Sequence, residues 1–199
     1  MLELAKQRDM IPLTYPVEIW DYLGWKDTLA KPAFTRRQRA YAAMVAGKRV
    51  YTPQTIVNGT AHCVGSDIKA IGRLKASTTK PTGSGLAVEK AGDGWNATAF
   101  VPEAALQRAR LMLLPITSRQ IVQIGRGENS GRTITYGNVV RDLIDLGPVG
   151  GPERKVSIAR KDIAIDNADG FALLIQIGSV EAPASVLAGA LIGPDGIRA

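Results

Sequence analysis

The sequence predicts two parts of different architecture: a mixed α/β part over residues 1–76 and a β-rich, sandwich-like part over residues 86–199. Residues 77–85 form a linker between them, because this stretch is rich in Ser, Thr and Gly and contains no large apolar residue. Helical and extended patterns alternate before the linker, whereas short apolar segments at regular spacing follow it. A chain of 199 residues is long enough for one domain or two small ones with a buried core.

The first part is predicted to alternate between helices and strands. Helices are expected at residues 2–6, 35–46 and 68–74, and strands at residues 11–17, 50–57 and 61–64. Thr35 begins the second helix, because a glutamine follows three residues later at the spacing of a capping box. Asn58-Gly59 favours a two-residue hairpin turn between the last two strands. Ser66 or Asp67 is suited to cap the last helix.

The second part consists of short apolar segments separated by turn-forming residues. These segments are residues 86–88, 95–101, 111–116, 120–124, 132–136, 155–158, 171–177 and 186–192. Such spacing is typical of an antiparallel sheet or a sandwich. A short helix over residues 139–146 is an additional expectation.

Excess positive charge is confined to the first part. Residues 1–80 hold 13 Lys and Arg against 6 Asp and Glu, which gives +7, and the remaining residues hold 12 of each. The densest cluster is Arg36, Arg37 and Arg39, which is typical of the solvated side of a helix. An anion-binding face is the alternative. Because no nucleic-acid motif accompanies the charge, we expect no nucleic-acid partner.

Cys63 is the single cysteine and therefore the one candidate thiol nucleophile. One cysteine excludes an internal disulfide, a dithiol redox cycle within the chain and a cysteine-based zinc cluster. His62 adjoins it, but neighbouring residues of a strand point to opposite faces, so a direct Cys–His pair is not expected. We interpret Cys63 as a small buried residue, and we expect no metal site and no cofactor.

No targeting signal is expected in this chain. No stretch approaches the roughly 20 apolar residues that cross a bilayer, and the N-terminus lacks the apolar core of a signal peptide. Taken by itself, the sequence therefore predicts a cytoplasmic protein without a membrane span.

An aromatic cluster provides the first set of candidate binding residues, Trp20, Tyr22 and Trp25. Positions 20 and 22 share one face of an extended segment. Tyrosine and tryptophan serve equally as a binding platform and as core packing beneath a loop, so both interpretations stay open.

A glycine-rich loop provides the second set, which is Arg126, Glu128, Asn129 and Arg132. Its backbone amides and guanidinium groups are suited to hold an anion. The alternative is an ordinary turn between two strands. The loop is not a nucleotide-binding P-loop, because no Lys-Ser or Lys-Thr follows the glycines.

Thr52 and Pro53 open the predicted hairpin, which a helix follows. A Thr-Pro pair before a hairpin and a terminal helix resembles the C-terminal half of the thioredoxin fold. That resemblance implies a cis Thr52–Pro53 peptide bond next to a redox site, and it makes both residues candidates for binding a peptide or protein substrate.

Longer motifs resemble one bacterial family, the domain of unknown function 1223, a thioredoxin-like family of mostly exported proteins. The resemblance is carried by residues 20–27, 35–41, 50–59, 126–133 and 136–140. It implies a thioredoxin-like first part that lacks the first strand and the Cys-x-x-Cys segment, which in the family precede the helix matching residues 2–6. Pro16, Val17 and Glu18 replace the His-Val-Asp that the family often has at this point.

The missing strand has a physical consequence, because its central place in such a sheet would leave unpaired backbone groups beside it. We therefore expect Met1 to be a misassigned start or the gene to be a decayed copy. The family resemblance implies that intact relatives are exported thiol–disulfide oxidoreductase-like proteins. For this chain we expect no redox competence, and the alternative is a non-catalytic peptide- or anion-binding scaffold of the cell envelope.

Overall fold

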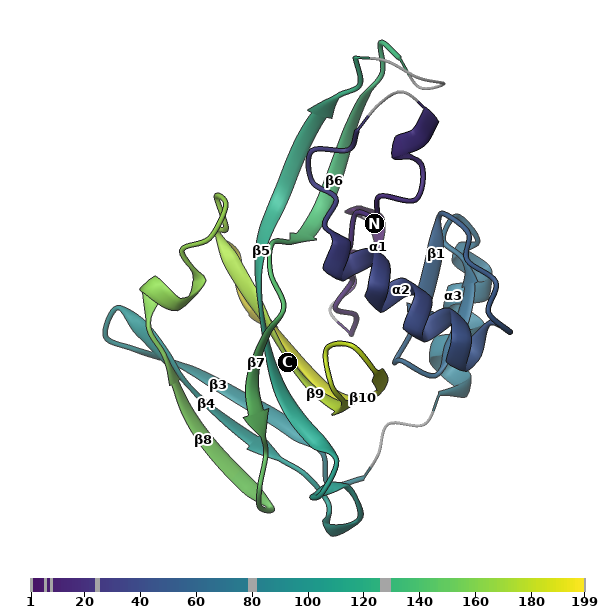
Figure 1. The fold of residues 1–199 in the computed structure, drawn as a ribbon. Helices are drawn as coiled ribbons and strands as arrows, with labels where there is room; N and C mark the ends of the chain where they lie inside the picture. Colours follow the sequence, from purple (N-terminus) through teal and green to yellow (C-terminus); the bar gives the residue numbers. More distant parts are fainter. Residues whose placement is uncertain are drawn as a thin grey trace.

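The computed structural model describes residues 2–5, 7, 9–23, 26–78, 82–125 and 130–198. The chain is mostly β-sheet, and the described residues form three sheets with few helices (Figure 1). The helices are α1 (Leu2–Ala5), α2 (Pro32–Val45) and α3 (Ile68–Ser77), with 3-10 turns η1 (Asp21–Leu23), η2 (Glu103–Ala105) and η3 (Arg160–Ile163). The strands are β1 (Gln54–Val57), β2 (Ala61–Val64), β3 (Gly85–Ala91), β4 (Gly94–Phe100), β5 (Ala109–Gln123), β6 (Thr133–Val140), β7 (Ile144–Pro148), β8 (Glu153–Ile158), β9 (Gly170–Gly178), β10 (Pro183–Gly193) and β11 (Gly196–Arg198).

Two antiparallel sheets of the second part enclose the larger hydrophobic core (Figure 1). The large sheet has the order β11-β10-β9-β5-β6, with β7 paired to β5, and the small sheet has the order β3-β4-β8. Ala97 and Ala99 of β4 pack against Leu111 of β5 in this core. Trp95 meets Phe171 of the opposite sheet edge to face, with ring centroids 5.0 Å apart. The β-rich prediction for this part is therefore confirmed.

Two predictions in the second part are wrong because pairing overrides local sequence. The expected break between segments 111–116 and 120–124 is absent, and β5 is a single strand of 15 residues. It continues because Thr117 pairs with Val139 and Arg119 with Gly137 of β6. The expected helix over 139–146 is absent, because its two ends pair with β5 as parts of β6 and β7.

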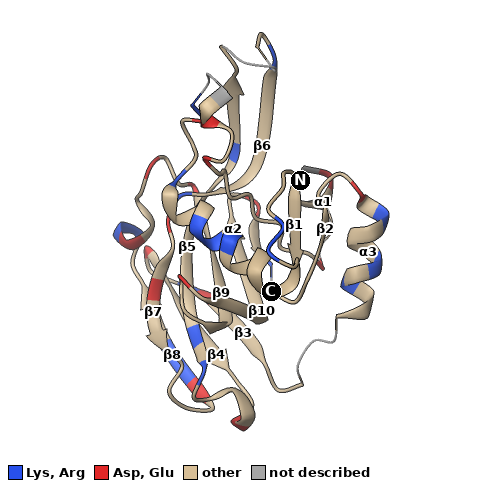
Figure 2. Ribbon diagram, turned by 45° about the vertical axis from the view of Figure 1, so that its right-hand side comes forward, with Lys and Arg blue, Asp and Glu red and all other residues tan. Residues whose placement is uncertain are grey.

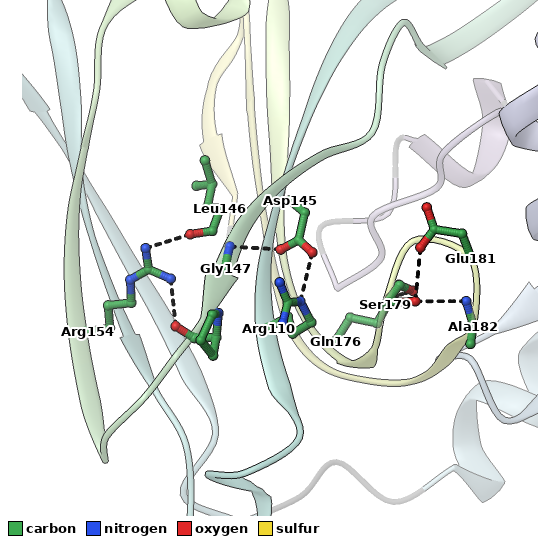
Figure 3. Close-up of polar contacts among 10 residues, drawn as sticks. Arg110, Asp145, Leu146, Gly147, Arg154, Gln176, Ser179, Glu181 and Ala182 are labelled. Carbon is green, nitrogen blue, oxygen red and sulfur yellow. Dashed lines mark hydrogen bonds and ion pairs between the residues drawn. The ribbon is translucent and has the colours of Figure 1, made fainter.

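Two arginines hold β7, a strand of the large sheet, in place (Figure 3). Arg110 Nε of β5 pairs with Asp145 Oδ2 at 2.8 Å, and Asp145 Oδ1 accepts the Gly147 N–H at 2.8 Å. Arg154 of β8 donates to two backbone carbonyls of β7 at 2.7 and 2.8 Å. Arg154 thus links β8 of the small sheet to β7 of the large sheet.

Helix α2 begins earlier than the sequence predicts. Its first residue is Pro32, which is favourable at this position because its ring presets the helical φ and its missing N–H needs no partner. Thr35 lies inside the helix, so the predicted capping box is wrong. The Thr35 Oγ1 instead accepts the backbone N–H of Glu18 at 3.1 Å, which ties the preceding loop to the helix.

The β1–β2 hairpin and α3 follow the predicted order. Asn58 and Gly59 adopt φ of 48° and 71°, and the Thr60 N–H donates to the Val57 carbonyl at 3.0 Å, which confirms the predicted turn. Asp67, one of the two predicted caps, caps α3 by accepting the Ala70 N–H at 2.8 Å. The first strand is shorter than expected, because residues 50–53 precede β1 without pairing as a strand.

Helix α2 joins the first part to the large sheet (Figure 1). Phe34 is buried against Met112 and Leu114 of β5 in a second hydrophobic cluster. Residues 11–17, predicted as a strand, make only an isolated parallel bridge between Thr14 and Val139 of β6. No helix in the described part of the chain is long and apolar enough to span a membrane.

Candidate functional site

One hydrogen bond brings together two of the predicted binding segments. The indole Nε1–H of Trp20 donates to Thr52 Oγ1 at 2.6 Å, although the two residues are 32 positions apart. Trp20 lies in the turn that leads into η1, and Thr52 lies just before β1. The Thr52–Pro53 peptide bond is cis. The aromatic segment and the Thr-Pro pair therefore form one continuous surface.

The aromatic side chains of this surface are open to solvent. Trp20 is 47% exposed and Tyr22 is 74% exposed, and their ring centroids lie 6.2 Å apart. Thr52 and Pro53 are exposed as well. Trp20 and Tyr22 thus lie outside the hydrophobic core, and neighbouring exposed aromatic side chains are a common feature of interaction sites. Trp25 lies outside the described residues.

A shallow basic hollow lies next to Trp20. Its volume is about 240 Å³, and its lining residues are Glu18, Ile19, Pro32, Thr35, Arg36 and Arg39. Arg36 and Arg39 are exposed and lie about one turn apart on α2 (Figure 2). Neither arginine forms an ion pair with another described residue. The hollow, which Glu18 also lines, therefore carries a net positive charge beside the aromatic surface.

Two glutamine side chains connect α2 to the start of β1. Gln38 Nε2 donates to the Tyr51 carbonyl at 2.9 Å and to Gln54 Oε1 at 3.1 Å. The remaining amide atoms, Gln38 Oε1 and Gln54 Nε2, are buried without a partner among the described residues. A buried amide atom without a hydrogen bond costs about 1–3 kcal/mol. The start of β1 thus holds more hydrogen-bonding capacity than the described chain uses.

Arg37 separates from the basic cluster that the sequence predicted to be solvated. It is 95% buried (5% exposed), and its Nη2 donates to Gln176 Oε1 and to the Tyr41 hydroxyl. Its guanidinium carbon lies 5.6 Å from the ring centroid of Tyr15 and 5.2 Å from that of Tyr41. Burial raises the pKa of Tyr15 to about 12. The helical spacing to Phe34 and Tyr41 was the signal that could have placed Arg37 on the inward face.

Cys63 lies in β2 with the environment of an unreactive thiol. It is partly buried, and burial first and Asp67 second raise its pKa, so less thiolate forms at neutral pH. His62 points elsewhere, since its Nδ1 is 2.7 Å from the Tyr51 hydroxyl. The expected absence of a Cys–His pair agrees with this geometry.

The glycine-rich loop connects β5 to β6. Arg126, Glu128 and Asn129 lie outside the described residues. At the described ends, the Gly131 N–H donates to the Ile124 carbonyl at 2.8 Å, and the Ile124 N–H donates to the Arg132 carbonyl at 2.9 Å. These bonds are those of a β-hairpin. Across the described chain, no group of three or more His, Cys, Asp or Glu side chains could hold a metal ion.

The fold defines a mostly β-sheet protein with a small helical part. This protein exposes an aromatic surface next to two arginines. The family model described as a protein of unknown function, DUF1223, matches residues 1–176, so the chain belongs to this family. An X-ray crystal structure of protein AGR_C_4864 from Agrobacterium tumefaciens is similar, with a TM-score of 0.80 and 26% sequence identity. That match covers 96% of this chain and 83% of the other. No curated protein matches the chain.

Proposed function

We propose that residues 1–76 form a thioredoxin-like domain that binds an extended peptide or protein segment without catalysing thiol–disulfide exchange by itself. The binding surface consists of Trp20, Tyr22, Thr52 and Pro53. The hydrogen bond from Trp20 to Thr52 carries the proposal, because it holds an exposed indole beside the residue pair that opens β1.

The order of elements supports the thioredoxin-like assignment. Helix α2 precedes the β1–β2 hairpin, and α3 follows it and packs against both strands. The Thr52–Pro53 pair stands at the start of β1, as the family resemblance implies. The proposal includes a linker at residues 77–85, a β-rich domain at residues 86–199 against which the first part packs, and an exported full-length form with a first strand and a Cys-x-x-Cys segment.

The proposed activity excludes redox turnover, because a single cysteine cannot supply the electrons that reduction of a disulfide needs. Reducing a substrate disulfide takes two electrons, which a dithiol provides by forming its own disulfide. Cys63 carries the only thiol of this sequence, and burial raises the pKa of that thiol. It could form a mixed disulfide but could not resolve it. An insulin-reduction assay should therefore show no turnover, and any catalytic rate that disappears in Cys63→Ser would contradict this part of the proposal.

A titration with a peptide tests the binding surface. We choose the capped pentapeptide Glu-Val-Thr-Val-Glu as the probe, because it is extended and acidic. Trp20→Ala should weaken its binding by at least tenfold, which is typical of a buried aromatic anchor in an interface. Phe100→Ala removes another exposed aromatic side chain, 39% exposed on β4, and should leave binding unchanged. Isothermal titration calorimetry measures both, and equal affinities of Trp20→Ala and the wild type would contradict the proposal.

A further inference from the structure

The small sheet turns one face to solvent on the side of the molecule away from the first part. Its other face packs against Leu111 and Leu113 of β5 in the larger core. Phe34 of α2 packs against Met112 and Leu114, which alternate with those two residues and so point to the opposite face of the large sheet. The large sheet therefore lies between the first part and the outer face of β3, β4 and β8 (Figure 1).

The strand register arranges the outward side chains of this face in three rows. Residues that pair across an antiparallel sheet point to the same face, so each row takes one residue from each strand. The rows are Glu89 with Asn96 and Ser157, Ala87 with Thr98 and Lys155, and Gly85 with Phe100 and Glu153. Three strands are about 10 Å wide, and the three rows span about 13 Å along them. The outer face is thus large enough for a small molecule of several rings.

A hollow lies in the first two rows, where short side chains stand between long ones. This sheet hollow has a volume of about 400 Å³, within the range of about 300–1,000 Å³ that is typical of small-molecule sites. Glu89 and Lys155 stand at its opposite corners, with Ala87 and Thr98 between them. Its polar lining residues are Glu89, Asn96, Thr98, Lys155 and Ser157. Each of the three strands therefore contributes polar groups to the sheet hollow.

Hydrogen-bonding groups of both kinds remain free in the sheet hollow. Ser157 Oγ donates to Asn96 Oδ1 at 2.9 Å, which leaves the Asn96 amide hydrogens and the Ser157 lone pairs for another partner. Glu89 forms no ion pair with another described residue. Lys155 pairs with Glu153 at 3.3 Å, and its ammonium has two further hydrogens. Donors and acceptors therefore lie side by side over a short distance.

This mixture of donors and acceptors favours a ligand whose groups do both, which is the property of a hydroxyl group. An anion would meet Glu89 and Glu153, and a cation would meet Lys155, so a single charge of either sign is not favoured. An apolar ligand would displace water from these groups without replacing its hydrogen bonds. Neighbouring hydroxyls of a sugar ring can instead satisfy a carboxylate, an amide and an ammonium group together.

An exposed aromatic ring continues the face into the third row. Phe100 is 39% exposed and follows Thr98 by two residues on β4, so both side chains point outward. Gly85 pairs with Phe100 and has no side chain that could cover the ring. A sugar ring presents C–H groups on its faces, and an aromatic side chain offers a large apolar surface for such groups. The step from Thr98 to Phe100 is about 7 Å, which is about the size of one sugar unit.

We propose that the outer face of the small sheet binds a neutral oligosaccharide. Glu89, Asn96 and Lys155 hold its hydroxyl groups in the sheet hollow, and Phe100 packs against the face of a neighbouring sugar unit. This site goes beyond the peptide surface at Trp20, because it gives the second part of the chain a ligand of its own.

Calorimetric titration of the whole chain with three neutral probes tests the ligand class. Cellotriose, maltotriose and triacetylchitotriose have the same length but differ in linkage and substituents. At least one should bind with a dissociation constant below about 1 mM, and added salt should leave its affinity unchanged because the ligand has no charge. Trigalacturonic acid should bind about tenfold more weakly or worse, because its carboxylates approach Glu89 and Glu153. Failure of all three neutral probes, or tighter binding of the acidic one, would overturn the proposal.

Variants of exposed side chains locate the site. Asn96→Ala removes the free amide donors and should weaken binding by about 3- to 10-fold. Phe100→Ala removes the aromatic surface and should weaken it by about tenfold or more. Ile121→Ala is the matched control, because Ile121 is another exposed apolar residue of a strand, 53% exposed on β5, and this variant should bind like the wild type. If an oligosaccharide binds equally well to Asn96→Ala and Phe100→Ala, the site lies elsewhere and the proposal is wrong.

The wild-type protein provides a test that does not depend on any variant folding. Amide chemical shifts in an NMR titration with the tightest neutral probe should change most on β3, β4 and β8. The largest changes anywhere else, such as at Trp20 and Thr52, would overturn the inference. The two ligands also separate: Phe100→Ala should lose the oligosaccharide and keep the peptide Glu-Val-Thr-Val-Glu, and loss of both would contradict two separate sites.

Discussion

Replacing Gln176 by leucine should strongly destabilise the protein through a residue more than a hundred positions away. Gln176 is completely buried in β9, and its Oε1 accepts a hydrogen bond from the guanidinium of Arg37 on α2. Its Nε2 donates to the Ser179 carbonyl at 3.0 Å (Figure 3). Arg37 has no carboxylate partner among the described residues, and its Nη1 is buried without a hydrogen bond. Gln176 thus supplies the strongest acceptor for a buried positive charge.

The magnitude follows from these contacts. A hydrogen bond to a charged group contributes about 1.5–3 kcal/mol, and the bond to Ser179 adds about 0.5–1.5 kcal/mol. Gln176→Leu should therefore lower the free energy of unfolding by about 2–4 kcal/mol. Arg37→Met removes the buried charge together with its unpaired nitrogen, but it leaves the buried Gln176 Oε1 without a donor, so it should cost about 1–3 kcal/mol. In that background Gln176→Leu loses the bond to Ser179 and also removes the unpaired Oε1, so its cost should be small.

A double-mutant cycle by urea denaturation measures the coupling between Arg37 and Gln176. We expect a coupling free energy of about 2 kcal/mol, because the cost of Gln176→Leu falls once the charge is gone. Circular dichroism and tryptophan fluorescence should report coincident transitions, which makes the comparison valid. The reasoning is refuted if Gln176→Leu costs the same in both backgrounds.

Three further predictions concern two turn glycines, a half-buried carboxylate and the thiol. Gly92 lies at a turn with φ +60° and no atom within 4 Å of an added Cβ, so Gly92→Ala should lower the free energy of unfolding by about 1–2 kcal/mol. Gly59→Ala should lower it by about 1–3 kcal/mol more than Gly92→Ala does, because its Cβ would lie 2.1 Å from the Ala184 carbonyl oxygen. Equal melting points of the two variants would contradict this. Burial raises the pKa of Asp27, so its folded state binds protons more tightly and stability falls as pH rises through the raised pKa. Asp27→Asn should therefore raise the urea midpoint at pH 7 but not at pH 3, and an equal gain at both would be evidence against it. Burial likewise raises the pKa of Cys63, so iodoacetamide labelling of the native protein should need a higher pH than labelling of the unfolded chain, and coincident pH curves would argue the opposite.

Local chemistry made part of the fold predictable. The turn at Asn58 and Gly59 needs a left-handed backbone, which this dipeptide tolerates better than others. The cap at Asp67 needs only a carboxylate three residues before an amide. The alternation of apolar segments after residue 85 likewise predicted the β-rich part, because a sandwich buries one face of each strand.

Long-range pairing made the rest unpredictable. Residues 139–146 have an acceptable helical pattern, but both ends find partners in β5, and tertiary pairing outweighs such weak local preferences. Arg37 looked like one of three solvated arginines, because the glutamine that accepts its hydrogen bond lies in β9. For the candidate site, the sequence identified Trp20 and Thr52 separately, but the hydrogen bond between them depends on how the loop before η1 packs against α2.

The β-rich part also supports the surface that the first part offers to a ligand. Two strands alone are marginal in water, so β1 and β2 need external support to stay rigid. Part of that support comes from β10, whose Val186 N–H donates to the Asn58 carbonyl at the turn at 2.9 Å. The Ala184 carbonyl of β10 also holds α2, by accepting the Tyr41 hydroxyl at 3.2 Å. Phe34 similarly completes its hydrophobic cluster with residues of β5, β9 and β10. The first part therefore depends on the large sheet for much of its packing. Destabilising the contact between Arg37 and Gln176 should accordingly weaken peptide binding at Trp20 without changing any residue of the binding surface, and it should do so most strongly near the unfolding midpoint.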